Sequence, residues 1–164
     1  MGALIFAASM EKSIGANIMK LKEGCSPELC AILELLAGFQ REFEALLEQA
    51  ISLSPGQSPP ELDTERLHGS DENWRRLTSA FAADMAPNAQ DYAVLWSVHA
   101  MLDKNAQYYQ QASKQSLQTQ FHLFFASIAE LKIMLRRRID GVERVLANQV
   151  WNSIGFSPVL LGRE

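Results

Sequence analysis

Residues 120–146 read QFHLFFASIAELKIMLRRRIDGVERVL and decide the fold of this chain. Apolar side chains recur along this stretch at intervals of three and four residues, which places them on one face of an α-helix. The pattern predicts one long helix that extends as far as Trp151. The residues of its apolar face are Phe121, Phe124, Phe125, Ile128, Leu131, Leu135, Ile139, Val142 and Leu146.

Three other segments have the same helical spacing, at residues 4–22, about 27–52 and 88–113. Ser26 is expected to cap the second of these helices, with a proline following in its first turn. Asn88 is expected to cap the third, with an acidic residue three positions later. Strand signals are almost absent, so the chain is predicted to be all-α.

A long connection joins the second and third of these helices. Residues 54–60 contain three prolines and a glycine, a composition that excludes a helix interior or a central strand. A weaker helical stretch follows at residues 62–87, with Ser70 as its expected cap. The sequence therefore predicts a single domain, residues 1–164, divided into a first hairpin at about 3–52, a crossover at 53–87, a second hairpin at about 88–150 and a tail at 151–164.

Composition excludes several classes of protein. The 164 residues suffice for one hydrophobic core, and 48 % apolar with 21 % charged residues is typical of a globular domain. A net charge of -4 gives no reason to expect nucleic acid or a membrane as a partner. Cys25 and Cys30 are expected to be free thiols, because their spacing is not that of a metal clamp. Residues 3–9 are apolar but lack a basic leader, so a cytoplasmic location is expected.

The two predicted hairpins resemble each other in sequence. Sliding the chain by 92 residues places Glu11 on Asp103 and Gln40 on Lys132, without a gap in either hairpin. Apolar positions of the second and fourth long helices coincide under the same offset. This self-similarity indicates an internal duplication of one helical hairpin.

Two acidic positions carry a resemblance to a known family. The segments FAASMEKS and AMLDKN place Glu11 and Asp103 where the rubrerythrin-like branch of the ferritin-like superfamily has a glutamate on the first helix of each hairpin. The resemblance covers about residues 3–50 and 92–140. It implies a ferritin-like four-helix bundle of two repeated helical hairpins with a long crossover connection. In such bundles, carboxylates and histidines from four helices hold two metal ions.

The second half of the family's metal-binding pattern is absent. The second helix of each hairpin supplies an E-x-x-H pair in the family, but LAGFQREF has Gln40 and Phe43 there, and IAELKIML has Lys132 and Leu135. None of these four side chains is a plausible ligand for iron. The resemblance therefore implies a degenerate di-iron site, and we expect neither a bound metal nor another cofactor.

A buried polar cluster of Glu11, Gln40, Asp103 and Lys132 is expected at the former metal-site positions. Buried carboxylates must be paired or neutralised, so a protonated lysine between the two acids would replace the charge of the metal. No nucleophile stands near a recognisable base, so no catalytic residue is assigned. The leading hypothesis is a non-enzymatic binding or interaction protein.

Two alternative functions remain open. An assembly with a second copy or a protein partner is expected whichever function holds. A metal-binding oxidoreductase or iron-handling protein would hold iron or another divalent metal in a rearranged site built from Glu11, Asp103 and some of His99, His122 and Glu130. A small apolar ligand could instead occupy the space between the helices. A homodimer or a protein partner is expected to cover large apolar side chains of the crossover and tail, namely Trp74, Phe81, Trp151 and Phe156.

Overall fold

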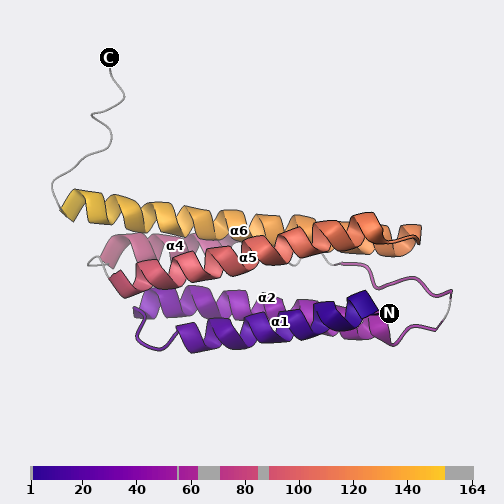
Figure 1. The fold of residues 1–164 in the computed structure, drawn as a ribbon. Helices are drawn as coiled ribbons and strands as arrows, with labels where there is room; N and C mark the ends of the chain where they lie inside the picture. The colour runs from indigo at the N-terminus through magenta and orange to yellow at the C-terminus, as the bar shows by residue number, and fades with distance from the viewer. Residues whose placement is uncertain (1, 55, 63–70, 85–88, 154–164) are drawn as a thin grey trace, which may run out of the picture.

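A computed structural model describes residues 2–54, 56–62, 71–84 and 89–153 of the chain (Figure 1). These residues form five helices and no strand, so the all-α prediction is confirmed. The helices are α1 (Gly2–Leu21), α2 (Pro27–Ile51), α4 (Asp71–Asp84), α5 (Ala89–Gln115) and α6 (Thr119–Ser153).

The turn between α1 and α2 follows the local sequence closely. Gly24 has a φ of 85°, in the left-handed region that glycine tolerates without steric cost, and it ends the first helix. The side chain of Ser26 accepts a hydrogen bond from the backbone nitrogen of Leu29 at 3.3 Å, and Pro27 occupies the first turn of α2. The predicted cap of this helix is therefore confirmed.

Two helical hairpins, α1 with α2 and α5 with α6, pack on one another along their length (Figure 1). The end of α1 meets the start of α5, where Gln90 Nε2 donates to the carbonyl oxygen of Glu23 at 3.0 Å. The start of α1 meets the far part of α5, where Tyr108 donates to the carbonyl oxygen of Ala3 at 2.8 Å. α1 and α5 are therefore antiparallel, and α2 runs in the same direction as α5.

The connection between the hairpins returns along the bundle, and its helix α4 packs against α2 and α6. Asp71 at the start of α4 pairs with Arg138, and the carbonyl oxygen of Ala82 near its end accepts from Gln149 at 2.8 Å. We expected Trp74 and Phe81 to be exposed, and this expectation was wrong. They are only 6 % and 0 % exposed, because α4 turns them into the core.

Some predicted features lie outside the described residues, namely the caps Ser70 and Asn88 and the tail residue Phe156. Trp151 lies near the end of α6 and is exposed. None of the described helices is long and apolar enough to cross a membrane.

The buried positions of α2 and α6 follow the 92-residue repeat found in the sequence. Every buried position of α2 from Ile32 to Ala50 has a buried counterpart on α6 that lies 92 residues later in the chain. The two faces meet in the middle of the bundle, where one polar pair, Gln40 and Lys132, interrupts the apolar side chains. This pair marks the candidate site.

Candidate functional site

Lys132 lies near the middle of α6, and its side chain is fully buried. Ile128 and Leu135, four and three residues away, are core residues on the same helix face, so the helical period directs Lys132 inward. Its ammonium nitrogen Nζ lies 2.6 Å from Glu11 Oε2 and donates to Gln40 Oε1 at 2.7 Å. The expected contact between Lys132 and Glu11 is therefore present.

Glu11 projects from α1 into the same cluster and is also fully buried. Its second oxygen, Oε1, accepts hydrogen bonds from Tyr109 at 2.7 Å and from Asn105 Nδ2 at 3.0 Å. Both carboxylate oxygens are thus satisfied by donors from α5 and α6. Three donors on the two oxygens hold this buried side chain in one position.

The aromatic residues of the cluster complete the environment of the two charges. The ring of Phe43 lies under Lys132, with Nζ 3.8 Å from the ring centroid, a cation–π geometry. Burial lowers the pKa of Lys132 to about 8, although the charge of Glu11 and the hydrogen bond to it act in the opposite direction. Burial, followed by the charge of Glu11, raises the pKa of Tyr109, which therefore remains a hydrogen-bond donor. At neutral pH the cluster is an ammonium paired with a carboxylate.

Two polar groups of the cluster keep a free hydrogen-bonding capacity. Within the described residues, neither the buried Gln40 Nε2 nor the buried Asn105 Oδ1 has a hydrogen-bond partner. A hollow of about 170 Å³ between α1 and α2 is lined by Glu11, Gln40 and Gly15, among others. Pockets for drug-sized ligands enclose roughly 300–1,000 Å³. This hollow is smaller, so it offers little support for the alternative of an apolar ligand in the interior.

Asp103 does not join the cluster, and the prediction that it lies beside Glu11 was wrong. Its side chain is one-third exposed, and it accepts hydrogen bonds from Arg136 Nη1 at 2.6 Å and from Gln107 Nε2 at 2.7 Å. The reason is helical geometry. Leu102 occupies the buried position, and the next residue lies about 100° further around the helix.

Asn105 and Tyr109 were not predicted as members of the cluster. Both lie on the buried face of α5, three and seven residues after Leu102. The signal in the sequence was a polar amide on the apolar stripe, at a spacing that directs it inward.

The residues of the alternative metal site do not converge on Glu11. His122 contacts Ser113, with Nδ1 3.1 Å from the serine hydroxyl, and Glu130 is exposed on α6. His99 lies between α5 and α6 beside Asp140 and Glu143. In the described part of the chain, these side chains are therefore divided among separate locations.

The cysteines are free thiols, as expected. The thiol of Cys25 donates to the carbonyl oxygen of Leu21 at 3.0 Å, and burial, followed by the charges of Asp91 and Cys30, raises its pKa to about 11. A thiol with such a pKa is a poor nucleophile at neutral pH.

Comparison of the chain with models of known families, with curated proteins and with solved structures gives no match. The function is therefore inferred from the geometry of the cluster and of the molecular surface.

Proposed function

We propose that this chain is a ferritin-like helical bundle that has lost the di-iron site and acts as a non-enzymatic binding or interaction protein. The observation that carries the proposal is the ion pair of Lys132 and Glu11, 2.6 Å long and fully buried. It occupies the place between the hairpins where the resemblance puts the metal ions. The ammonium supplies positive charge to a buried carboxylate, as a bound cation would.

The connectivity supports the ferritin-like part of the proposal. α2 and α5 run in the same direction, and a long connection joins the two hairpins (Figure 1). Two hairpins with one long crossover are typical of ferritin-like bundles. The buried positions shared by α2 and α6 further support a duplicated hairpin.

The chemistry of the cluster supports the loss of metal binding. Both oxygens of Glu11 already accept hydrogen bonds, and the facing positions hold Gln40, Phe43, Lys132 and Leu135. A second cation beside Lys132 would be repelled by the ammonium at short range. The interior therefore serves the stability of the bundle, and binding is left to the surface.

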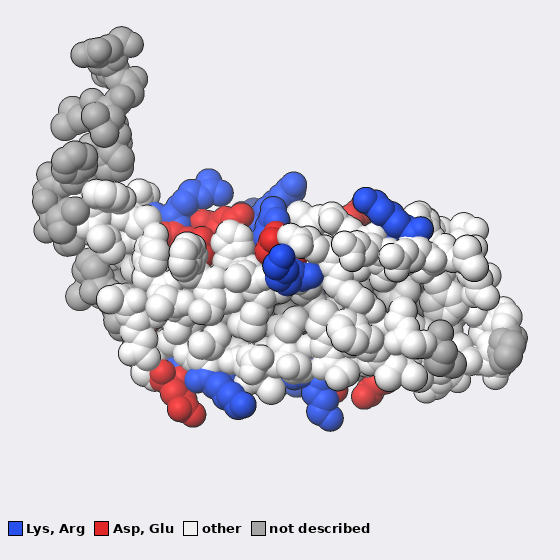
Figure 2. All heavy atoms as spheres, viewed as in Figure 1, with Lys and Arg blue, Asp and Glu red and all other residues white. Residues whose placement is uncertain are grey.

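The surface over α1 and α5 is the proposed interaction surface. Figure 2 shows charged side chains along the edges of the molecule and few of them across the face between. Large apolar residues are exposed on these two helices, among them Phe6 at 58 % and Trp96 at 72 %. A second copy of the chain is the proposed partner, because two identical faces with few charges can meet without like-charge repulsion.

Light scattering of the purified chain tests this homodimer. We expect the mass of a dimer for the wild type and for Leu123→Glu, which places the same charge at an exposed position of α6. Trp96→Glu is expected to give the mass of a monomer, because it buries an unpaired charge in the interface. A monomeric wild type at high protein concentration would contradict the proposal.

Iron uptake tests the loss of the interior metal site. The full chain is treated with a chelator, incubated anaerobically with ferrous iron, desalted and subjected to elemental analysis. We expect no retained iron that depends on Glu11. Stoichiometric iron in the wild type that is lost in Glu11→Gln would show that the interior still binds metal, and would overturn the proposal.

A further inference from the structure

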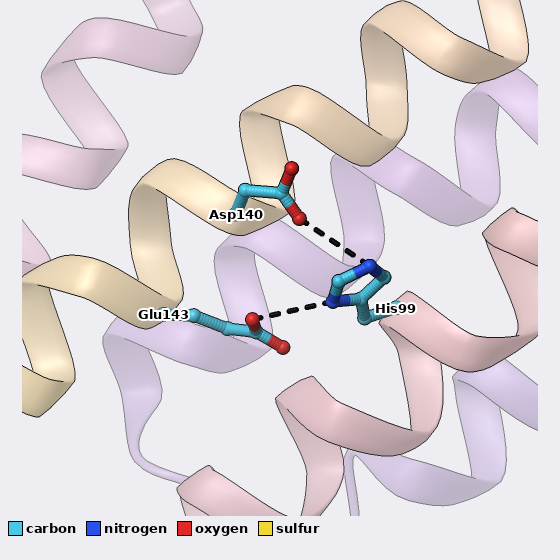
Figure 3. A group of neighbouring side chains, drawn as sticks. All are labelled: His99, Asp140 and Glu143. Atoms are coloured by element: carbon cyan, nitrogen blue, oxygen red, sulfur yellow. Dashed lines mark hydrogen bonds and ion pairs between the residues drawn. The ribbon is translucent and has the colours of Figure 1, made fainter.

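A second cluster of titratable side chains lies between α5 and α6, away from the Lys132 cluster. Asp140 and Glu143 are three residues apart on α6, so they project from the same side of the helix. His99 of α5 reaches between them (Figure 3). Its Nε2 lies 3.5 Å from Asp140 Oδ1, and its Nδ1 lies 3.3 Å from Glu143 Oε2.

This cluster has unused hydrogen-bonding capacity. Asp140 Oδ1 and Glu143 Oε1 are buried atoms that accept no hydrogen bond from any described residue. In the described part of the chain, neither acid forms an ion pair with a lysine or arginine, and the nearby Arg136 pairs with Asp103. Two carboxylates thus share one imidazole, an arrangement that leaves negative charge and electron pairs available for a cation.

We propose that His99, Asp140 and Glu143 bind a divalent first-row transition-metal ion, with Zn²⁺ the best fit. One ligand atom from each of the three residues lies within 4.8 Å of the other two. An imidazole nitrogen with carboxylate oxygens is a ligand set that suits zinc, and three protein ligands leave a position for water. Zinc bonds of about 2.0–2.2 Å at tetrahedral angles place ligand atoms roughly 3.3–3.6 Å apart.

The ion binds through one ring nitrogen. His99 Nε2 and Asp140 Oδ1 already have the required spacing of 3.5 Å. Glu143 now contacts the other nitrogen of the ring, and its longer side chain completes the site by rotating towards the ion. Deprotonated imidazole nitrogen is the ligand, so protons and metal compete for His99.

The proposed site is partly open to solvent. The side chains of His99, Asp140 and Glu143 are 33 %, 27 % and 21 % exposed, so a hydrated ion can approach and exchange its waters for protein ligands. This site lies outside the Lys132 cluster and does not depend on the proposed function.

Calorimetric titration of the chelator-treated full chain with Zn²⁺ tests the site, with Mg²⁺ as the comparison ion. We expect one zinc ion per chain and much weaker binding of Mg²⁺, which prefers an all-oxygen environment. His99→Ala and Glu143→Gln are each expected to weaken zinc binding by at least about tenfold, since even outer-shell partners contribute this much. Glu130→Gln is the matched control, because it removes the same charge from an exposed position of α6.

Two further measurements keep the test decisive. Nitrogen chemical shifts of the histidine rings identify the ligand, and zinc is expected to move the signals of His99 and not those of His122. Circular dichroism verifies that each variant is folded, and His99→Asn replaces His99→Ala if the alanine variant is not. The proposal is overturned if the wild type binds no zinc. It is also overturned if folded His99 variants bind zinc as the wild type does, or if binding is lost only in Cys25→Ser or Cys30→Ser.

Discussion

The Lys132 cluster and the His99 cluster use similar groups in opposite ways. In each cluster, a nitrogen-containing side chain of one helix contacts a carboxylate of another helix. In the interior, Lys132 and Glu11 are fully buried, and both oxygens of the carboxylate are satisfied at 2.6–3.0 Å. Between α5 and α6, the contacts of His99 are 3.3 Å and 3.5 Å long, and buried carboxylate oxygens remain without hydrogen bonds.

Burial explains the difference between the two clusters. A charge that is removed from water must find all its partners within the protein, so a stable interior has little capacity left for a ligand. A charge at the edge of two helices keeps access to water and can remain partly unsatisfied. We therefore assign the interior cluster to stability and the outer cluster to binding.

Replacement of Lys132 should have the largest effect on stability. Lys132→Met leaves Glu11 buried without its counter-charge, which should lower the free energy of unfolding by on the order of 3–5 kcal/mol at neutral pH. Lys104→Met is the control, because Lys104 is exposed on α5 and its ammonium donates to Gln107 Oε1 at 3.5 Å. Denaturant unfolding measures both. Equal losses in the two variants would mean that the interior pair has no special role.

The stability of the interior cluster should also depend on pH in the alkaline range. Burial lowers the pKa of Lys132 from 10.5 to about 8, so between these values the unfolded chain binds a proton that the folded chain has released. The free energy of unfolding therefore rises as pH increases through this window, by about 3 kcal/mol for a shift of this size. Below the window Lys132 is protonated in both states, so its effect on the free energy of unfolding does not change with pH.

The reference for this pH dependence is the double variant Glu11→Gln, Lys132→Met, which has no titratable side chain at either position. The difference in unfolding free energy between the wild type and this variant should increase from about pH 8 to about pH 10.5. A difference that stays flat or declines over this range would contradict the assignment of a desolvated lysine.

Tyr109 and Tyr108 are adjacent in sequence, and one makes an interior hydrogen bond while the other makes a surface one. Removing each hydroxyl in turn therefore compares the two locations. Tyr109→Phe removes a donor to the buried Glu11 carboxylate and should cost about 1.5–3 kcal/mol. Tyr108→Phe removes a bond to the carbonyl oxygen of Ala3, which lies in an exposed location, and should cost about 0.5–1.5 kcal/mol. Thermal or denaturant unfolding of the two variants gives the comparison, and a larger loss for Tyr108→Phe would reverse the account.

The smallest effect is expected at Asp103. Its contact with Arg136 is partly exposed to solvent, so Asp103→Asn should change the free energy of unfolding by less than about 1 kcal/mol. A loss comparable with that of Lys132→Met would indicate that Asp103 belongs to the interior cluster after all.

The sequence predicted the buried faces of α2 and α6 better than that of α5. On α2 and α6, each polar member of the cluster is flanked by large apolar residues at helical spacing, so Gln40 and Lys132 could be assigned to the buried face. On α5, an offset without gaps placed Asp103 on Glu11, although Leu102 and Asn105 face inward. A shift of one residue turns a side chain by about 100°, and alignment of a repeat cannot resolve it.

The packing of α4 and the existence of the His99 cluster could not be predicted from the sequence either. The burial of Trp74 and Phe81 depends on where the crossover lies against α2 and α6, which local patterns do not specify. His99 meets Asp140 and Glu143 only because α5 and α6 are adjacent with a particular register. Such contacts between distant parts of the chain follow from tertiary structure.

A double-mutant cycle on Glu11 and Lys132 tests the central claim most directly. The free energy of unfolding is measured for the wild type, Glu11→Gln, Lys132→Met and the double variant. If the two charges neutralise each other in the interior, the double variant should lose less than the sum of the single losses, by at least about 2 kcal/mol. Losses that add within about 0.5 kcal/mol would mean that Lys132 and Glu11 act independently, and would contradict the account.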